Sequence, residues 1–118
     1  FIYMVHGQWL FNVTAEREGV PGAVLVRALE PLEGLELMLK RRRVTRVEEL
    51  TSGPGKLTQA MGITREQHGL DLTSPRSPIR VEAGEGDFEV ASSHRIGVSA
   101  DLERELRFFI KGNRFVSR

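Results

Sequence analysis

The chain begins with the stretch Phe1-Ile-Tyr-Met-Val-His-Gly-Gln-Trp-Leu-Phe-Asn12, which is as apolar and aromatic as a buried β-strand. It also carries polar or amphipathic side chains that a core strand does not need, at Tyr3, His6, Gln8, Trp9 and Asn12. We predict a strand over residues 1–14 that bends at Gly7, because glycine permits a tight turn or a bulge.

Length and composition favour one modest domain, since 118 residues can bury one core but not two. The net charge is only +1, yet basic residues 40–43 and acidic residues within 82–89 lie in separate parts of the chain. Such separation is typical of a protein that docks on a polyanion, although a solvated helix face explains the basic block equally well. Cysteine is absent, which excludes disulfides and Cys-ligated zinc. With no long apolar run and no visible leader, we expect an intracellular protein that is not membrane-bound.

Residues 23–29 form an apolar, β-branched run, the pattern of a strand buried on both faces. Arg27 interrupts this run, and an unpaired buried charge is very costly. The guanidinium therefore needs either a carboxylate partner, such as Glu30, or a functional role.

A helix is predicted from Pro31 to about Arg42, because proline suits a first turn and leucines follow at helical spacing. A second, short helix is predicted at 46–50, with Thr45 as its cap and Glu48 at the capping-box position.

A third helix is predicted between Pro54, which suits the first helical position, and Gly62, which is a C-terminal stop signal. The free amides at its start, with Ser52 and Lys56 beside them, form a candidate anion or phosphate site. The spacing is not that of a Walker motif, so a nucleotide-binding P-loop is not predicted.

The remaining patterns predict a capping box at 64–67, strands at 79–82, 88–91 and 106–112, and a helical turn at 101–105. His68 has no second histidine or carboxylate at metal spacing, so no metal site is predicted. These elements together indicate a mixed α and β fold rather than a regular βαβ series.

Three blocks, taken together, resemble a known family. They are Val26-Arg-Ala-Leu-Glu-Pro-Leu-Glu-Gly34, Ser52-Gly-Pro-Gly-Lys-Leu-Thr-Gln-Ala-Met-Gly-Ile63, and Arg95-Ile-Gly-Val98 with Leu106-Arg-Phe-Phe-Ile-Lys-Gly112. In this order and spacing they are similar to the alkyladenine (3-methyladenine) DNA glycosylases, monofunctional enzymes that remove alkylated purines. The resemblance implies one α+β domain with a curved, open-barrel-like antiparallel sheet, a protruding β-hairpin and short flanking helices. It implies no cofactor.

The resemblance gives the opening stretch a role in DNA. It looks like the family's strand pair that enters the minor groove, where a wedge side chain fills the space left by the flipped base. His6 matches the wedge position, where relatives often have tyrosine. This sequence is one residue shorter between Gly7 and Asn12, so Gln8 and Trp9 remain alternatives for the wedge.

The same resemblance supplies roles for the pocket. Tyr3 matches an aromatic wall that stacks on cationic alkylpurines, and Asn12 matches an asparagine that crowds the exocyclic amine of guanine. Arg27 matches the arginine that holds the nucleophilic water, together with a backbone group at the position of Ile96. A carboxylate acts as general base while an oxocarbenium-like state develops.

Gly53, Gly55 and Lys56 match phosphate-binding positions, and Arg41–Arg43 would add to the electrostatic footprint. The implied partner is double-stranded DNA with a damaged purine, bound by a monomer.

The family's general-base glutamate lies in a segment that precedes the hairpin, and no carboxylate of this sequence matches that segment. We therefore interpret residues 1–118 as the C-terminal part of one glycosylase domain, inactive and loosely folded by itself. The alternative interpretations are a non-catalytic duplex-DNA-binding module derived from the family, or a small-molecule or protein-interaction domain.

Overall fold

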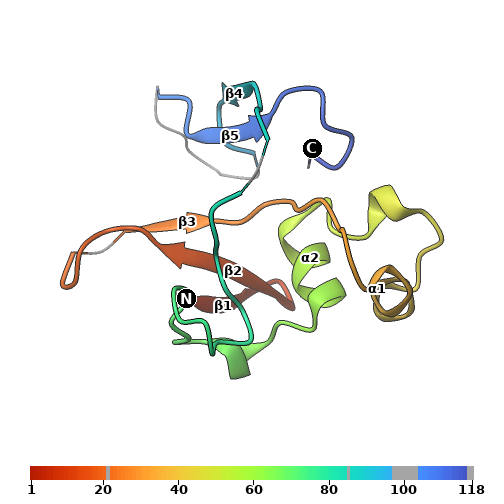
Figure 1. The fold of residues 1–118 in the computed structure, drawn as a ribbon, viewed down its shortest axis with the longest axis horizontal. Helices are drawn as coiled ribbons and strands as arrows, with labels where there is room; N and C mark the ends of the chain where they lie inside the picture. The colour runs from red at the N-terminus through yellow and green to blue at the C-terminus, as the bar shows by residue number, and fades with distance from the viewer. Residues whose placement is uncertain (21, 85, 97–103, 117–118) are drawn as a thin grey trace.

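A computed structural model describes residues 1–20, 22–84, 86–96 and 104–116. The predicted class is confirmed: the chain is a mixed α+β domain, and its strands form two open antiparallel sheets that lie one above the other in Figure 1. The elements are, in order, β1 (Ile2–Val5), β2 (Gln8–Thr14), β3 (Ala23–Leu25), α1 (Leu35–Arg42), η1 (Val47–Glu49), α2 (Pro54–Met61), η2 (Arg65–Gln67), β4 (Val90–Ser93) and β5 (Arg107–Ile110). Most of the helical turn predicted at 101–105 lies outside the described residues.

The opening stretch is not one bent strand but a hairpin of β1 and β2. The pairing of Val5 with Gln8 leaves a two-residue turn, and its residues His6 and Gly7 have φ angles of 50° and 77°. Two successive residues with positive φ are the signature of a type I′ turn, whose twist matches that of the flanking strands. Gly7 is therefore a true turn residue, and β2 continues as the central strand between β1 and β3.

The core lies where this three-stranded sheet packs against α2. Its buried members are Ile2 and Phe11 from the hairpin and Leu57 and Ile63 from α2 and the residues just after it. The predicted limits of α2 are confirmed, with Pro54 in the first turn and Gly62 ending the helix at φ 69°.

The predicted start of α1 is wrong. Gly34 has φ 73° at the N-cap, so the chain enters the helix from a left-handed residue and α1 begins at Leu35 instead of Pro31. Thr45 does not cap η1 either, because the N-cap of η1 is Arg46, and this cap makes no side-chain hydrogen bond. The Glu48 carboxylate, predicted at the capping-box position, pairs with Arg46 and Arg114.

The capping box predicted at η2 is confirmed, since Thr64 and Gln67 bond each other's backbone reciprocally. Two predicted strands are shorter than expected or shifted: β4 covers 90–93 rather than 88–91, and β5 covers 107–110 rather than 106–112.

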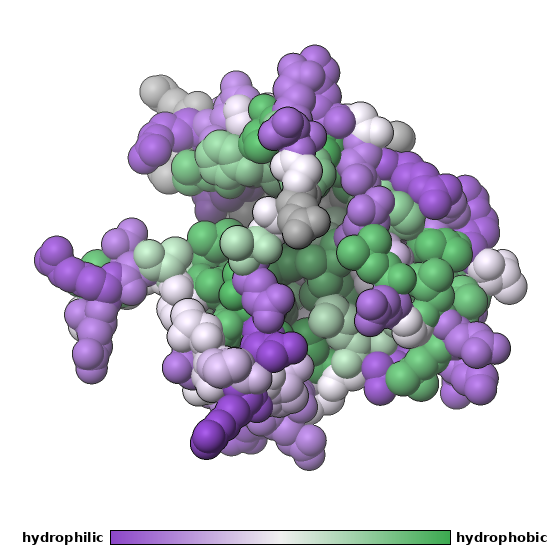
Figure 2. Space-filling model, in the orientation of Figure 1, coloured by the Kyte–Doolittle hydropathy of each residue, from purple (hydrophilic) through white to green (hydrophobic). Residues whose placement is uncertain are grey.

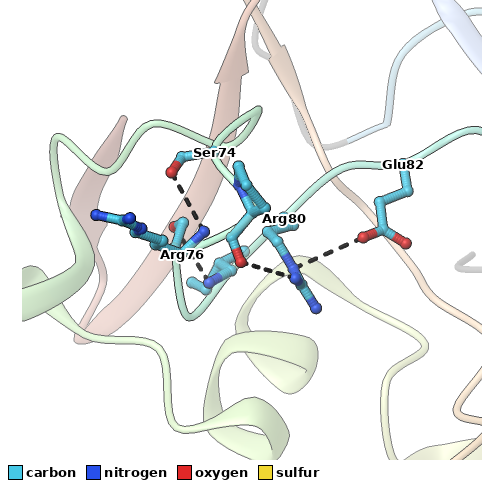
Figure 3. Close-up of polar contacts among 7 residues, drawn as sticks. Ser74, Arg76, Arg80 and Glu82 are labelled. Atoms are coloured by element: carbon cyan, nitrogen blue, oxygen red, sulfur yellow. Dashed lines mark hydrogen bonds and ion pairs between the residues drawn. The ribbon is translucent and has the colours of Figure 1, made fainter.

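The strand predicted at 79–82 does not form. Arg80 Nη1 donates to the Pro75 carbonyl at 2.9 Å, and its Nε lies 3.7 Å from a Glu82 oxygen. The Val81 amide donates to the Leu72 carbonyl. The segment thus folds back onto its own loop, as Figure 3 shows, and the Val81 amide bonds the loop instead of a neighbouring strand.

β3 also ends earlier than predicted, at Leu25 instead of residue 29. The Val26 amide still donates to the Phe11 carbonyl of β2 at 3.0 Å. Further along, the chain pairs with Thr51 instead: the Leu29 amide donates to the Thr51 carbonyl, and Thr51 Oγ1 donates to the Leu29 carbonyl at 2.6 Å. This exchange anchors the segment after β3 at Leu29 rather than in the sheet.

Candidate functional site

A cleft of about 810 Å³ opens between the two sheets. Its lower wall comes from β1, β2 and β3 with the residues that follow, and its upper wall comes from β5. On the face shown in Figure 2, hydrophobic side chains gather in the hollow of the molecule while hydrophilic ones surround it. Tyr3, Asn12 and Arg27 all line this cleft, so three of the predicted site residues are brought together.

Tyr3 and Asn12 reach the cleft from neighbouring strands. The Tyr3 ring is 40% exposed and lies 5.3 Å, centroid to centroid, from the ring of Phe1. Asn12 is buried, and its Nδ2 lies 3.4 Å from the Phe1 carbonyl and 3.5 Å from the Leu10 carbonyl. Both distances exceed the roughly 2.9 Å of an ordinary N–H···O bond. The amide is therefore only weakly held.

Arg27 is half-buried, and its Nε is buried without a hydrogen-bond partner. Burial first, and then the positive charge of Arg107, lower the pKa of the Arg27 guanidinium from its ordinary value. The group still stays protonated, because arginine does not lose its proton in proteins. Within the described ranges no ion pair joins Arg27 to Glu30, the structural partner considered above.

Arg107 is a cleft residue that sequence reasoning did not single out. It lies 4.5 Å over the Phe109 ring, and its Nη1 donates to Ser93 Oγ at 3.1 Å. The available signal was a guanidinium inside an apolar strand, the same signal that marks Arg27. Ile96 is not among the cleft-lining residues, but its neighbour Arg95 is.

The three candidate wedge residues lie in different surroundings at the tip of the β1–β2 hairpin. His6 occupies the exposed turn itself, in a left-handed conformation that is uncommon for a residue other than glycine. The Gln8 side chain lies against Gly55 at the start of α2, and Trp9 packs against the core.

The predicted phosphate-binding residues surround the start of α2. Its first turn has neither an acidic residue nor a side-chain cap, so the first amides are left without a side-chain acceptor. Lys56 is exposed and lines a smaller hollow of about 260 Å³ together with Ser52, Glu48 and Arg114. Arg114, which the sequence did not single out for this site, lies 2.8 Å from a Glu48 oxygen.

Two arginines of the basic block hold helices together. Arg41 Nη1 donates to the Ala60 carbonyl at 3.1 Å, and Arg42 donates to the Leu50 and Glu49 carbonyls and to Gln59 Oε1. These bonds fasten α1 to α2 and to the end of η1, so the Arg42 guanidinium is occupied by the fold, whereas Arg41 is exposed and bonds α2 through the Ala60 carbonyl. Arg43 ends α1 and is exposed.

Among the residues that the structure describes, no three His, Asp or Glu side chains gather as metal ligands. In the same part of the chain, no helix has the length and apolar character needed to cross a membrane.

The sequence model of the Methylpurine-DNA glycosylase (MPG) family matches residues 1–114. The chain belongs to the methylpurine-DNA glycosylase family. Relatives named "Putative 3-methyladenine DNA glycosylase" include one from Salinibacter ruber, 48% identical over 99% of this chain and 57% of the relative. Proteins with the same name from Oceanobacillus iheyensis and Bacillus subtilis are 42% and 41% identical over the whole chain.

Membership of the methylpurine-DNA glycosylase family confirms the resemblance on which the site was predicted. The chain spans about three-fifths of the length of these relatives, 57%, 60% and 61% respectively.

Proposed function

We propose that this chain acts in a monofunctional DNA glycosylase of base excision repair. The enzyme flips alkylated or deaminated purines out of duplex DNA and hydrolyses the N-glycosidic bond with an activated water. The observation that carries the proposal is the convergence of Tyr3, Asn12 and Arg27 on one cleft in a member of this family.

The cleft suits a flipped purine. Ligand pockets in proteins span roughly 300–1,000 Å³, and this one measures about 810 Å³. The exposed Tyr3 ring offers a π-face, which attracts the positive charge that alkylation places on a purine. The weakly held Asn12 amide lies beside it to test the edge of the base, and would crowd the exocyclic amine of a normal guanine.

Arg27 is suited to hold the water. Its buried Nε has an unmade hydrogen bond, and a donor in that position gains from a water oxygen placed against it. A backbone group near Ile96 would hold the same water, and a carboxylate from outside these residues would accept its proton as the sugar becomes oxocarbenium-like. Residues 1–118 alone would then bind DNA weakly and release no base.

DNA would be held outside the cleft, by the tip of the hairpin and the start of α2. His6 would fill the space left by the flipped base, while Lys56 and the amides near Gly53 and Gly55 would hold backbone phosphates. The partner is thus duplex DNA with a damaged purine, bound by one copy of the protein.

A pair of measurements tests the proposal. The first compares the affinity of the chain for a duplex with a stable abasic analogue and for the same undamaged duplex; the second measures base release from hypoxanthine- and 3-methyladenine-containing duplexes. We expect tighter binding of abasic DNA and no release by this chain alone. The same assay is then run on a longer protein that also contains the part which the relatives have outside the matched region. Base release by that longer protein would establish the enzyme. Duplex binding without release from that longer protein would instead support the non-catalytic DNA-binding module.

A further inference from the structure

The wedge hairpin and the phosphate-binding helix are joined by a part-buried hydrogen bond. Thr58, in the second turn of α2, is 2% exposed, and its Oγ1 donates to the Trp9 carbonyl of β2 at 2.8 Å. The Gly55 carbonyl lies 3.0 Å from the same oxygen. A hydroxyl has one proton to donate, and the shorter contact reaches across to the hairpin.

A second contact at the same junction is steric. A Cβ atom at residue 55 would lie 3.0 Å from Gln8 Cβ and would overlap Gln8 Oε1. Gln8 directly follows the turn residues His6 and Gly7. Glycine at position 55 therefore lets the tip of the hairpin rest directly on the first turn of α2, as the arrangement of β2 and α2 in Figure 1 also shows.

We propose that Thr58 is a positioning residue that couples the wedge to the phosphate-binding loop; this rests on the function proposed above. Thr58 itself would contact neither the base stack at His6 nor a phosphate at Gly53–Lys56. Its hydroxyl instead connects Trp9 of the hairpin to the helix whose first amides would bind phosphate. β3 pairs only with Asn12–Thr14 of β2, so near its tip the hairpin is a two-stranded ribbon. Such a ribbon is only marginally stable without further support. Phosphate binding at Gly53–Lys56 then sets where His6 enters the duplex.

The chain contains a matched control for this residue. Thr51 is 1% exposed, and its Oγ1 also donates to a backbone carbonyl, that of Leu29, at 2.6 Å. Its bond lies away from the hairpin, between the residues after β3 and the loop before α2. Loss of either hydroxyl leaves a part-buried carbonyl without this partner, so the two losses should be similar in free energy.

The experiment compares Thr58→Val and Thr51→Val. The readout is the ratio of the dissociation constants for undamaged and abasic-analogue duplexes, with thermal unfolding measured in parallel. A 1 Å misplacement of a functional group can cost up to about 100-fold; we expect Thr58→Val to lower this ratio on the order of tenfold. Thr51→Val should lower the melting temperature similarly and leave the ratio within about twofold.

Three further measurements separate positioning from simple stability. Thr58→Ser keeps the hydroxyl and should restore the ratio. The salt dependence of binding should not change in Thr58→Val, because no phosphate contact is removed. In a double-mutant cycle, Thr58→Val should add little to His6→Ala, since both act through one wedge. If Thr58→Val fails to fold, Thr58→Ala, with no methyl beside the two carbonyls, carries the same test.

An unchanged ratio in Thr58→Val or Thr58→Ala overturns the coupling, and so do additive effects with His6→Ala. An equal loss of the ratio in Thr51→Val also overturns it, because general loosening would then explain the result. If the unaltered chain itself shows no preference for abasic DNA, the proposed function fails first, which distinguishes the two failures.

Discussion

At the scale of single residues, Arg27 lowers the stability of the fold, and its position in the cleft explains why it is there. Arg27 is half-buried, its Nε lacks a hydrogen-bond partner, and the charge that lowers the pKa of its guanidinium is that of another arginine. Groups that a fold tolerates at a cost in stability are typical of functional sites. Arg107, by contrast, is supported by Ser93 and Phe109.

Replacing these two arginines should therefore have opposite effects on stability. We expect Arg27→Met to stabilise the fold by about 1 kcal/mol, because it removes an unsatisfied buried donor while keeping an apolar stem. Arg107→Met should destabilise it by a similar amount, because a hydrogen bond and a cation–π contact are lost. Denaturant unfolding measures both, and a destabilised Arg27→Met would contradict this account.

Glu48 is the second residue with a testable effect. Its carboxylate lies in the hollow that Lys56 lines, and it pairs with Arg114. If DNA phosphate binds at Lys56 as proposed, the Glu48 charge would repel it and would neutralise Arg114, so Glu48→Gln should strengthen duplex binding by a few-fold at low salt. Titration over a salt series would show the gain shrinking as salt rises. Glu36→Gln, on α1 and outside this hollow, is the control with the same charge change.

At the scale of elements, the β1–β2 hairpin combines a favourable turn with an unfavourable turn residue. Type I′ turns prefer Asn-Gly, because asparagine tolerates positive φ better than most residues. His6 has φ 50° in this position. Its presence is explained if the imidazole is needed at the tip.

His6→Asn should therefore stabilise the hairpin by roughly 0.5 kcal/mol while weakening the preference for abasic DNA, since the wedge ring is lost. Gly7→Ala is the complementary variant, and should destabilise by about 1 kcal/mol because alanine is strained at positive φ. Melting temperatures together with the two duplex affinities would check both. A stronger abasic preference in His6→Asn would contradict the wedge role.

At the scale of the whole molecule, the cleft and upper sheet leave large apolar side chains uncovered. Val24, Val90 and Phe108 are 57%, 64% and 67% exposed, on β3, β4 and β5. Apolar surface of this kind marks an interaction face or a source of aggregation. About two-fifths of the length of the relatives lies outside the matched region.

We therefore expect the isolated chain to be loosely packed around the cleft. It should bind the dye ANS strongly and melt over a broad range, because exposed apolar surface and weak tertiary packing give these signals. Fluorescence titration and calorimetry would test this. A sharp, cooperative transition at high temperature without dye binding would show that the described core is sufficient.

The sequence by itself determined the features that depend on neighbouring residues. Gly7 marks the turn, Pro54 and Gly62 mark α2, and Thr64 with Gln67 form the capping box, because these signals act through local dihedral angles and bonds across three or four residues. The three spaced blocks determined the family, which the match over residues 1–114 confirms.

Only the tertiary structure decided which residues meet. Thr51 reaches Leu29 across 22 positions, Thr58 reaches Trp9 across 49, and Arg114 reaches Glu48 across 66. These bonds anchor the segment after β3 at Leu29, connect the hairpin to α2, and pair Arg114 with Glu48 in the hollow that Lys56 lines. Such pairings depend on how the sheet and helices pack, and packing energy is shared among many distant residues, so no local pattern encodes them.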